Sequence, residues 1–223
     1  MKIILFGSTG MIGQGVLIEC LNDAQIESVM VINRKPGKLS HPKLTEIIHA
    51  DFFDLSPVKS QLSGYDACFY CLGVSSAGLT ESEYHKNTFE LTTKVAETLL
   101  SANKDIIFCY ISGAGTDSSE KGRTMWARVK GKTENALLQM PFKQAYMFRP
   151  GFIQPLNGIK SRTGLYNAMY TIFKPFYFLL KHLEGIVTNT QTLGKAMIVA
   201  AAKGYEKKIL ESKDINEIVK RNA

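Results

Sequence analysis

Three glycines near the N-terminus have the spacing of a phosphate-binding loop. They are Gly7, Gly10 and Gly13 in the stretch GSTGMIGQG, which directly follows the apolar run KIILF. Where a strand turns into a helix, such glycines permit the tight turn, the approach of a pyrophosphate to the backbone, and close helix packing. An ordinary tight turn would use the same residues, but this context favours dinucleotide binding. We expect the dinucleotide to contact Gly7, Thr9, Gly10, Met11, Ile12 and Gly13.

The residues after the second expected strand indicate which dinucleotide is bound. An acidic residue about 20 residues beyond the glycine loop holds the ribose 2′-hydroxyl of NAD, whereas this chain has Asn33, Arg34 and Lys35 there. No carboxylate at this point repels a 2′-phosphate, and the guanidinium of Arg34 can pair with one in a planar fork, with Lys35 or Lys38 adding charge. NADP is therefore favoured over NAD. The alternative is an exposed arginine in a basic turn.

Two further strand ends provide candidate contacts for the adenosine part of the cofactor. The stretch ADFFDL places Asp51 and Phe52 after the third expected strand, where an adenine edge would lie. The stretch CLG places Leu72 and Gly73 after the fourth, along the adenine ribose. Because an aspartate at a strand end equally often caps a turn, both roles stay open for Asp51.

Strands and helices alternate along the chain as far as Gly151. Apolar runs typical of strands occur at residues 2–7, 28–34, 44–52, 65–73, 106–113 and 144–151, and helical patterns at 11–22, 81–103 and 125–140. Strands that are almost continuously apolar indicate a parallel sheet covered by helices on both faces. We therefore expect an α/β fold, a doubly wound parallel sheet of the Rossmann type, with ligands beyond the carboxyl ends of its strands.

The pattern changes after Gly151. Helical patterns at 190–204 and 214–221 flank a short strand at 207–212. Residues 152–223 are expected to form a small cap on the substrate side of a single domain that spans residues 1–223. The aromatic segment at 164–185 is interrupted by Lys174 and Pro175, which leaves two short amphipathic pieces. Helices that cover a pocket or core are favoured over contact with a membrane surface, and no stable membrane insertion is expected.

Composition narrows the class of protein further. The 223 residues are 45% hydrophobic with a net charge of +7. The basic residues are scattered and form no aromatic-interleaved stripe, so no nucleic-acid partner is expected. The cysteines lie in apolar runs and MKIILFG is too short for a secretory signal, so a reduced, cytoplasmic protein is the simplest interpretation. Cys68 and Cys71 would point to opposite faces of one strand, which favours core packing over a redox or metal role.

These motifs together resemble the atypical short-chain dehydrogenase/reductases, particularly their NmrA-like and epimerase-like NAD(P)-binding members. The resemblance covers nearly the whole chain and rests on GSTGMIG, NRKPG, DFFD, CLG, YISGAG, VKGKTE and FRPG. It implies that Ser112 orients a substrate carbonyl, that Lys130 holds the nicotinamide ribose, and that Pro150 and Gly151 line the cofactor site. A turn-capping role for Ser112 and a solvated helix position for Lys130 are the alternatives.

One position departs from the pattern of that family. In that family, the tyrosine that passes the proton stands four residues before the lysine. This spacing puts both side chains on one helical face. Here the position holds Trp126, the single tryptophan of the chain. An indole N–H donates a hydrogen bond but cannot deliver and recover a proton. Trp126 is expected either to form an apolar floor beside the nicotinamide or to anchor its helix to the cap.

Two classes of function follow. The first and favoured one is an NADP-dependent oxidoreductase that acts on an unidentified small carbonyl compound and takes its proton from Tyr84, Tyr166, Tyr170 or a water. The second is a catalytically inactive protein that binds NADP(H) and reports redox state through a partner, as the resemblance to NmrA-like proteins allows. The sequence does not define the oligomeric state.

Overall fold

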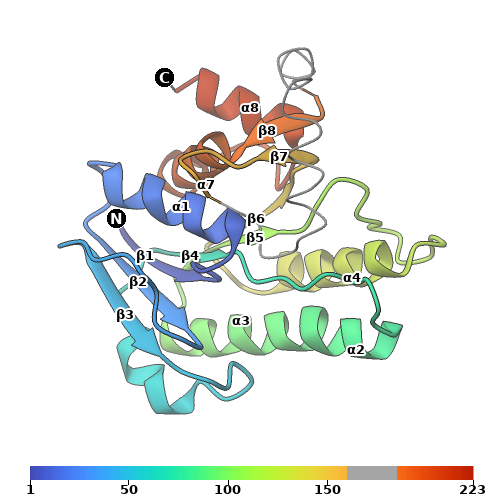
Figure 1. Ribbon diagram of the computed structural model, residues 1–223. Coiled ribbons are helices and arrows are strands. Elements are labelled where there is room, and N and C mark those ends of the chain that lie inside the picture. Colours follow the sequence, from blue (N-terminus) through green and yellow to red (C-terminus); the bar gives the residue numbers. More distant parts are fainter. Residues whose placement is uncertain (160–184, 223) are drawn as a thin grey trace.

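The structure, a computed structural model, describes residues 1–159 and 185–222. Within these residues a seven-stranded sheet has the order β3-β2-β1-β4-β5-β6-β9, and every neighbouring pair is parallel. The strands are β1 (Lys2–Phe6), β2 (Ser28–Asn33), β3 (Leu44–Ile48), β4 (Ala67–Tyr70), β5 (Ile107–Ile111), β6 (Gln144–Arg149) and β9 (Ile209–Glu211). The chain proceeds outward from β1 to β3 and then returns to β4, so the strand order switches direction between β1 and β4 (Figure 1).

Helices cover both faces of this sheet (Figure 1). One face carries α1 (Met11–Asn22), α7 (Thr190–Lys203) and α8 (Ser212–Lys220), and the other carries the 3-10 turn η1 (Ser56–Gln61), α3 (Leu91–Ala102) and α4 (Met125–Gln139). Successive strand residues point to opposite faces. Ile3 and Leu5 of β1 therefore pack in the core beneath α1 and α7, and Ile4 packs in the core beneath α3. The predicted doubly wound α/β fold is confirmed.

The helix expected at 81–103 contains one wider turn. Its first part, α2 (Glu81–His85), continues through a π-helical turn, η2 (Lys86–Glu90), into α3. The start of α2 follows from the sequence: the Thr80 hydroxyl accepts the Glu83 N–H at 3.3 Å, and the Glu83 carboxylate accepts the Thr80 N–H at 2.9 Å. This reciprocal capping box satisfies two donors that the first helical turn leaves free.

The region expected as a cap contributes to the main layers of the fold. Strand β9 pairs with β6 at the edge of the large sheet, and α7 packs along α1. The close approach of these helices has a local cause: a Cβ added at Gly15 would lie 2.5 Å from Thr190 Cβ, and one added at Gly194 would lie 2.9 Å from Glu19 Cγ. Two short strands, β7 (Phe152–Gln154) and β8 (Val187–Asn189), pair in parallel as a separate sheet.

The aromatic segment predicted from sequence lies, apart from Gly185, outside the described residues. Tyr166 and Tyr170, both considered as proton donors, fall in it. Of the helices in the ranges that the structure describes, none combines the length and hydrophobicity needed to cross a membrane.

Candidate functional site

The glycine loop after β1 has the geometry that its spacing predicted. Gly7 has a φ of +83°, and a Cβ there would lie 2.7 Å from the Cys71 carbonyl carbon. A Cβ at Gly13 would lie 2.1 Å from the Gly7 carbonyl oxygen, so α1 passes too close to the loop for any side chain. A Cβ added at Gly10 would have the Gly7 carbonyl oxygen as its nearest neighbour, at 3.4 Å, which is an ordinary contact. Gly10 thus leaves open space at the N-terminus of α1, where backbone N–H groups attract phosphates.

Two adjoining cavities form one groove across the carboxyl ends of the central strands, which we call the strand-end groove. The first has a volume of about 500 Å³ and lies at the ends of β1, β2 and β4. It is lined by Gly7, Thr9, Gly10, Met11, Ile32, Asn33, Arg34, Lys35, Pro36, Phe52, Cys71, Leu72 and Gly73. The guanidinium carbon of Arg34 lies 6.0 Å from the centre of the Phe52 ring. This half has the aromatic and cationic groups that suit an adenosine with a phosphate.

The second half lies where β5 and β6 end and has a volume of about 390 Å³. It is lined by Gly10, Met11, Ile12, Cys71, Leu72, Gly73, Val74, Ser75, Ile111, Ser112, Gly113, Lys130, Pro150, Gly151, Phe152 and Ile153. Gly10, Met11 and the segment 71–73 border both halves. The groove is therefore continuous from Arg34 to Lys130, and it passes the open face of Gly10.

Two predicted contacts lie outside the groove. Asp51 is exposed and is not among the described residues that line either half; its carboxylate accepts the Phe53 N–H at 2.9 Å. The Asp51 carboxylate caps this turn, which is one of the two roles that the sequence left open for it. Gly13 lies behind the loop and acts through helix packing.

Lys130 reaches the groove from α4. Its Nζ donates to the carbonyl oxygens of Ser112 and Ile111, the latter at 3.5 Å, and lies 5.9 Å from the centre of the Tyr110 ring. Burial lowers the pKa of the ammonium to about 8, and the charge of Glu134 partly opposes this. Lys130 therefore changes its charge close to neutral pH, unlike a solvated lysine.

The Ser112 hydroxyl belongs to a buried polar network. It lies 2.5 Å from Glu134 Oε1 and 3.1 Å from the Phe148 carbonyl oxygen, so its single hydrogen points toward an acceptor within the protein. Glu134 is fully buried and is paired with Arg149, whose Nε lies 3.1 Å from both carboxylate oxygens. Such a charged pair is tolerated in a core because hydrogen bonds satisfy both partners.

Neither Glu134 nor Arg149 was predicted as a site residue. Both stand within motifs already noted, VKGKTE and FRPG. A signal was present: Glu134 follows Lys130 by four residues and so lies on the same helical face. Its burial depends on Arg149 at the end of β6, a pairing that no local pattern reveals.

Trp126 lies one turn before Lys130 on α4, as the family spacing requires. Its ring lies against the loop after β5, with Cη2 3.6 Å from where a Gly115 Cβ would be. Trp126 is not among the described residues lining the groove. The helix carrying it is held close to the same loop, because a Cβ at Gly131 would lie 1.8 Å from the Asp117 carbonyl oxygen. Tyr84, another proposed proton donor, is 2% exposed within α2 and is also not among those lining residues.

Residues 3–122 match the NAD dependent epimerase/dehydratase family. The chain belongs to this family. A nicotinamide dinucleotide cofactor is thereby supported, whereas a preference for NADP is not decided by membership.

Two curated fungal proteins are similar to this epimerase/dehydratase-family chain. Protein FMP52, mitochondrial, from Chaetomium globosum is 27% identical over 221 residues, which cover 95% of this chain and 94% of that protein. Leucinostatins biosynthesis cluster protein T from Purpureocillium lilacinum is 27% identical over 168 residues, covering 72% of this chain and 61% of that protein.

Solved structures share the fold at low sequence identity. The Bordetella bronchiseptica enzyme WbmF in complex with NAD+ has a TM-score of 0.64 and 16% identity, covering 98% of this chain and 77% of that one. MoeE5 in complex with UDP-glucuronic acid and NAD has a TM-score of 0.67 and 16% identity, covering 94% and 75%. These likenesses confirm the Rossmann-type fold.

The expected cytoplasmic localisation is contradicted by the relatives. FMP52 proteins from Chaetomium globosum, Emericella nidulans and Meyerozyma guilliermondii are named mitochondrial. That expectation rested on a first apolar run too short for a secretory signal and on cysteines that lie in apolar runs. Neither criterion distinguishes the cytoplasm from mitochondria, which use different targeting sequences.

Cys68 has the core-packing role that the sequence favoured for both cysteines of the CxxC pair, whereas Cys71 lies just beyond the end of β4 and is half-buried. Cys68 is buried, Cys71 borders the groove, and both are free thiols whose pKa is raised by burial. Among the described residues, no three or more His, Cys, Asp and Glu side chains are placed to hold a metal ion.

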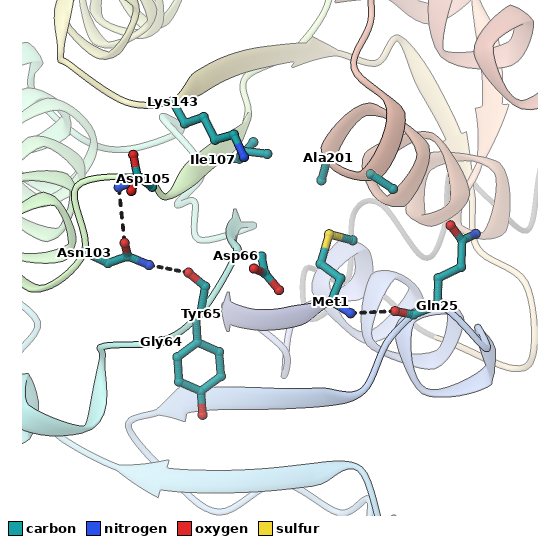
Figure 2. A pocket seen from close by; sticks show the side chains of 11 residues that line it. Met1, Gln25, Gly64, Tyr65, Asp66, Asn103, Asp105, Ile107, Lys143 and Ala201 are labelled. Carbon is teal, nitrogen blue, oxygen red and sulfur yellow. Dashed lines mark hydrogen bonds between the residues drawn. The ribbon is translucent and has the colours of Figure 1, made fainter.

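Another large cavity lies at the amino ends of the strands (Figure 2). It has a volume of about 600 Å³ and is lined by Met1, Gln25, Gly64, Tyr65, Asp66, Asn103, Asp105, Ile107, Lys143, Ala201 and Ala202. Its polar groups bond largely within the protein: the Met1 ammonium donates to the Gln25 carbonyl at 2.7 Å, and Asp66 accepts the Lys2 N–H at 2.6 Å. Ligands of doubly wound sheets bind at the opposite edge, so we assign no site here.

The glycine loop yields a first prediction. Gly10→Val should fold normally but weaken NADPH binding at least about 10-fold, because the new side chain fills the space for the pyrophosphate. Gly13→Ala is the matched comparison and should lower the free energy of unfolding by about 1–3 kcal/mol through overpacking. Calorimetric titration and thermal unfolding of both variants check this. Unchanged NADPH binding by Gly10→Val would exclude the loop as the pyrophosphate site.

Proposed function

We propose that this protein is an NADP(H)-dependent oxidoreductase that reduces a small carbonyl compound. The observation that carries the proposal is the continuous strand-end groove from Arg34 to Lys130. Its first half offers cations and an aromatic ring for a phosphorylated adenosine, and its second half offers an ionisable cation where β5 ends. The intervening Gly10 leaves its backbone open to a pyrophosphate.

The adenosine end supports NADP rather than NAD. Arg34 and Lys35 both line this half of the groove and both are exposed, so they are available to a 2′-phosphate. The position that an acidic residue takes in NAD-binding proteins holds Asn33, which is 4% exposed and accepts the Ser8 hydroxyl at 2.8 Å. A planar guanidinium suits a phosphate better than the hydroxyl pair of an unmodified ribose.

The groove contains a group that can replace the missing tyrosine. A bound reduced dinucleotide supplies the hydride for the carbonyl carbon, and the carbonyl oxygen then needs one proton. As an ammonium, Lys130 has three N–H groups. Two point to the carbonyls of Ile111 and Ser112, so one remains for the groove. Lys130 gives this proton to the oxygen, which yields an alcohol, and regains a proton from water.

Other described groups in this half are less suited to the role. Its described lining contains two ionisable side chains, Cys71 and Lys130. Burial raises the pKa of the Cys71 thiol, so that thiol stays neutral and is a poor acid. Lys130, with a pKa of about 8, can both lose and regain a proton near neutral pH.

A second function, cofactor binding without turnover, is favoured by Trp126 and Ser112. Trp126 removes the proton-relay tyrosine of the family, and the Ser112 hydroxyl is directed to Glu134 rather than to a substrate. Under this alternative the protein reports the NADP(H) redox state through a partner.

Deuterium transfer distinguishes the two functions. The protein is incubated with NADPH carrying deuterium at C4 and with a panel of aldehydes, ketones and quinones, and the products are analysed by mass spectrometry. We expect slow deuterium incorporation into at least one alcohol product. Tight NADPH binding without incorporation into any product would favour the sensor function.

Arg34→Ala tests the cofactor preference. This variant should bind NADPH about 10- to 150-fold more weakly, which corresponds to about 1.5–3 kcal/mol for hydrogen bonds to a charged group. NADH binding should change less than about 2-fold, because NADH has no 2′-phosphate. Lys213→Ala, which removes an exposed charge on α8, controls for the general loss of positive charge. Equal losses for both cofactors would contradict the assignment.

A further inference from the structure

A carboxylate on the edge strand lies next to the adenosine end of the groove. Glu46 is in β3 and is paired with Val31 of β2, two residues before Asn33. Residues two apart on a strand share a face, so Glu46 and Asn33 project to the same side of the sheet. The strand partners of β3 were unknown from sequence, and Glu46 was not predicted as a site residue.

Glu46 joins two segments that meet the cofactor. Its Oε1 accepts the Asn33 side-chain amide at 2.7 Å and the Gly37 N–H at 2.8 Å. Asn33 in turn accepts the Ser8 hydroxyl at 2.8 Å. A chain of hydrogen bonds therefore runs from the glycine loop, through Asn33 and Glu46, to the backbone of the basic turn 34–38.

The basic turn needs such an anchor. Residues 34–40 are all exposed and contain Arg34, Lys35 and Lys38. Long cationic side chains on an unanchored turn lose conformational entropy when they bind a ligand, which lowers affinity. The ring of Pro36 fixes the backbone φ angle within the turn, and the hydrogen bond from the Gly37 N–H to Glu46 holds the next residue in place.

A cavity of about 410 Å³ lies between this turn and the glycine loop. It is lined by Ser8, Thr9, Gln14, Leu17, Val31, Asn33, Pro36, Gly37, Lys38, Leu39, Leu44, Glu46 and Gly158. It shares Thr9, Asn33 and Pro36 with the adenosine half of the groove. The basic turn thus lies between this cavity and the adenosine half of the groove. Its position determines where the side chains of Arg34, Lys35 and Lys38 lie.

We propose that Glu46 is a positioning residue for cofactor selectivity: by holding Gly37 and Asn33, it places the basic turn to receive a 2′-phosphate. The inference rests on the proposed NADP(H) function. Glu46 acts through the turn and does not touch the 2′-phosphate, because the negative charges of a carboxylate and a phosphate repel each other. The position of its acceptor oxygen, rather than its charge, is what the turn requires.

This distinction defines the experiment. NADPH and NADH are titrated by calorimetry into the unmodified protein and into Glu46→Ala and Glu46→Gln, with thermal unfolding measured for each. Glu46→Ala should weaken NADPH binding about 10-fold, the cost of about one hydrogen-bonded contact of this type. It should change NADH binding less than about 2-fold. Glu46→Gln keeps an acceptor oxygen and should retain NADPH affinity within about 3-fold.

The outcomes separate this inference from the function on which it rests. If Glu46→Ala binds NADPH as tightly as the unmodified protein, or more tightly, the positioning role is wrong. The carboxylate would then either have no effect on NADPH binding or weaken it by repelling the 2′-phosphate. If the unmodified protein shows no preference for NADPH, the NADP(H) function fails and this inference fails with it. Glu46→Thr, which suits an edge strand, replaces the alanine variant if that variant unfolds.

Discussion

Trp126→Tyr is expected to raise the rate of NADPH-dependent carbonyl reduction. Because Lys130 already donates the proton in the unmodified protein, the gain should be smaller than the full contribution of general acid catalysis, which is about 10²- to 10⁴-fold. The reason for the gain is positional. Residues 126 and 130 share one face of α4, and the Lys130 ammonium reaches the end of β5. A tyrosine hydroxyl one turn earlier on this face would lie beside that ammonium. The positive charge would lower the phenol pKa and favour proton release.

Trp126→Phe is the matched control for this experiment. Both variants remove the indole and leave a similar cavity against Gly115, so they share any loss of packing. They differ in the hydroxyl alone. The rate of NADPH oxidation is measured with the same panel of carbonyl compounds after folding has been checked by thermal unfolding. A tyrosine variant no faster than the phenylalanine variant would show that residue 126 does not occupy a relay position.

Replacing Lys130 is expected to have the opposite effect. Lys130→Met should reduce kcat by about 10²- to 10⁴-fold, because it removes the proposed proton donor. Lys130→Arg separates proton transfer from cofactor binding. Its guanidinium keeps a positive charge and several donors but cannot be deprotonated. The arginine variant should bind NADPH within a few-fold of the unmodified protein and still show a kcat as low as that of the methionine variant.

The pH dependence of the reaction follows from the same group. Burial lowers the Lys130 pKa to about 8, and only the protonated form can donate. In the unmodified protein kcat should therefore be highest below this pH and fall as the pH rises through about 8. The arginine variant should lack this fall. An arginine variant that turns over like the unmodified protein would exclude Lys130 as the donor, and Tyr166→Phe and Tyr170→Phe would then be compared.

A readout that needs no turnover checks the ionisation directly. The rate at which an amine-reactive acetylating reagent modifies Lys130 is followed by mass spectrometry as a function of pH. Half-maximal reactivity should occur close to pH 8, well below the usual value for lysine. Titration above pH 10 would show that the ammonium is solvated, as the sequence alternative for Lys130 holds.

The parts of the fold that follow local rules could be predicted from the sequence. The apolar strands, the helix start at Thr80 and the spacing of Gly7, Gly10 and Gly13 depend on residues close together in the chain. These features also locate the groove, because ligands in parallel sheets bind where strand order reverses. Lys130 could be placed for a similar reason, since it lies on a helix that follows β5.

The residues missed from sequence depend on contacts distant in the chain. Glu46 meets Asn33 because of the register of β3 on β2, and Glu134 is buried because Arg149 reaches it from β6. Periodicity shows that 190–204 is a helix with a buried face but does not show that this face packs on α1. For the same reason part of the expected cap belongs to the main layers of the fold.

The most direct test of the central claim is calorimetric titration of the unmodified protein with NADPH and, separately, with NADH at one salt concentration. We expect one binding site per chain and a dissociation constant for NADPH at least about 10-fold below that for NADH, corresponding to about 1.4 kcal/mol or more. Equal affinities, a preference for NADH, or no binding of either dinucleotide would contradict that claim.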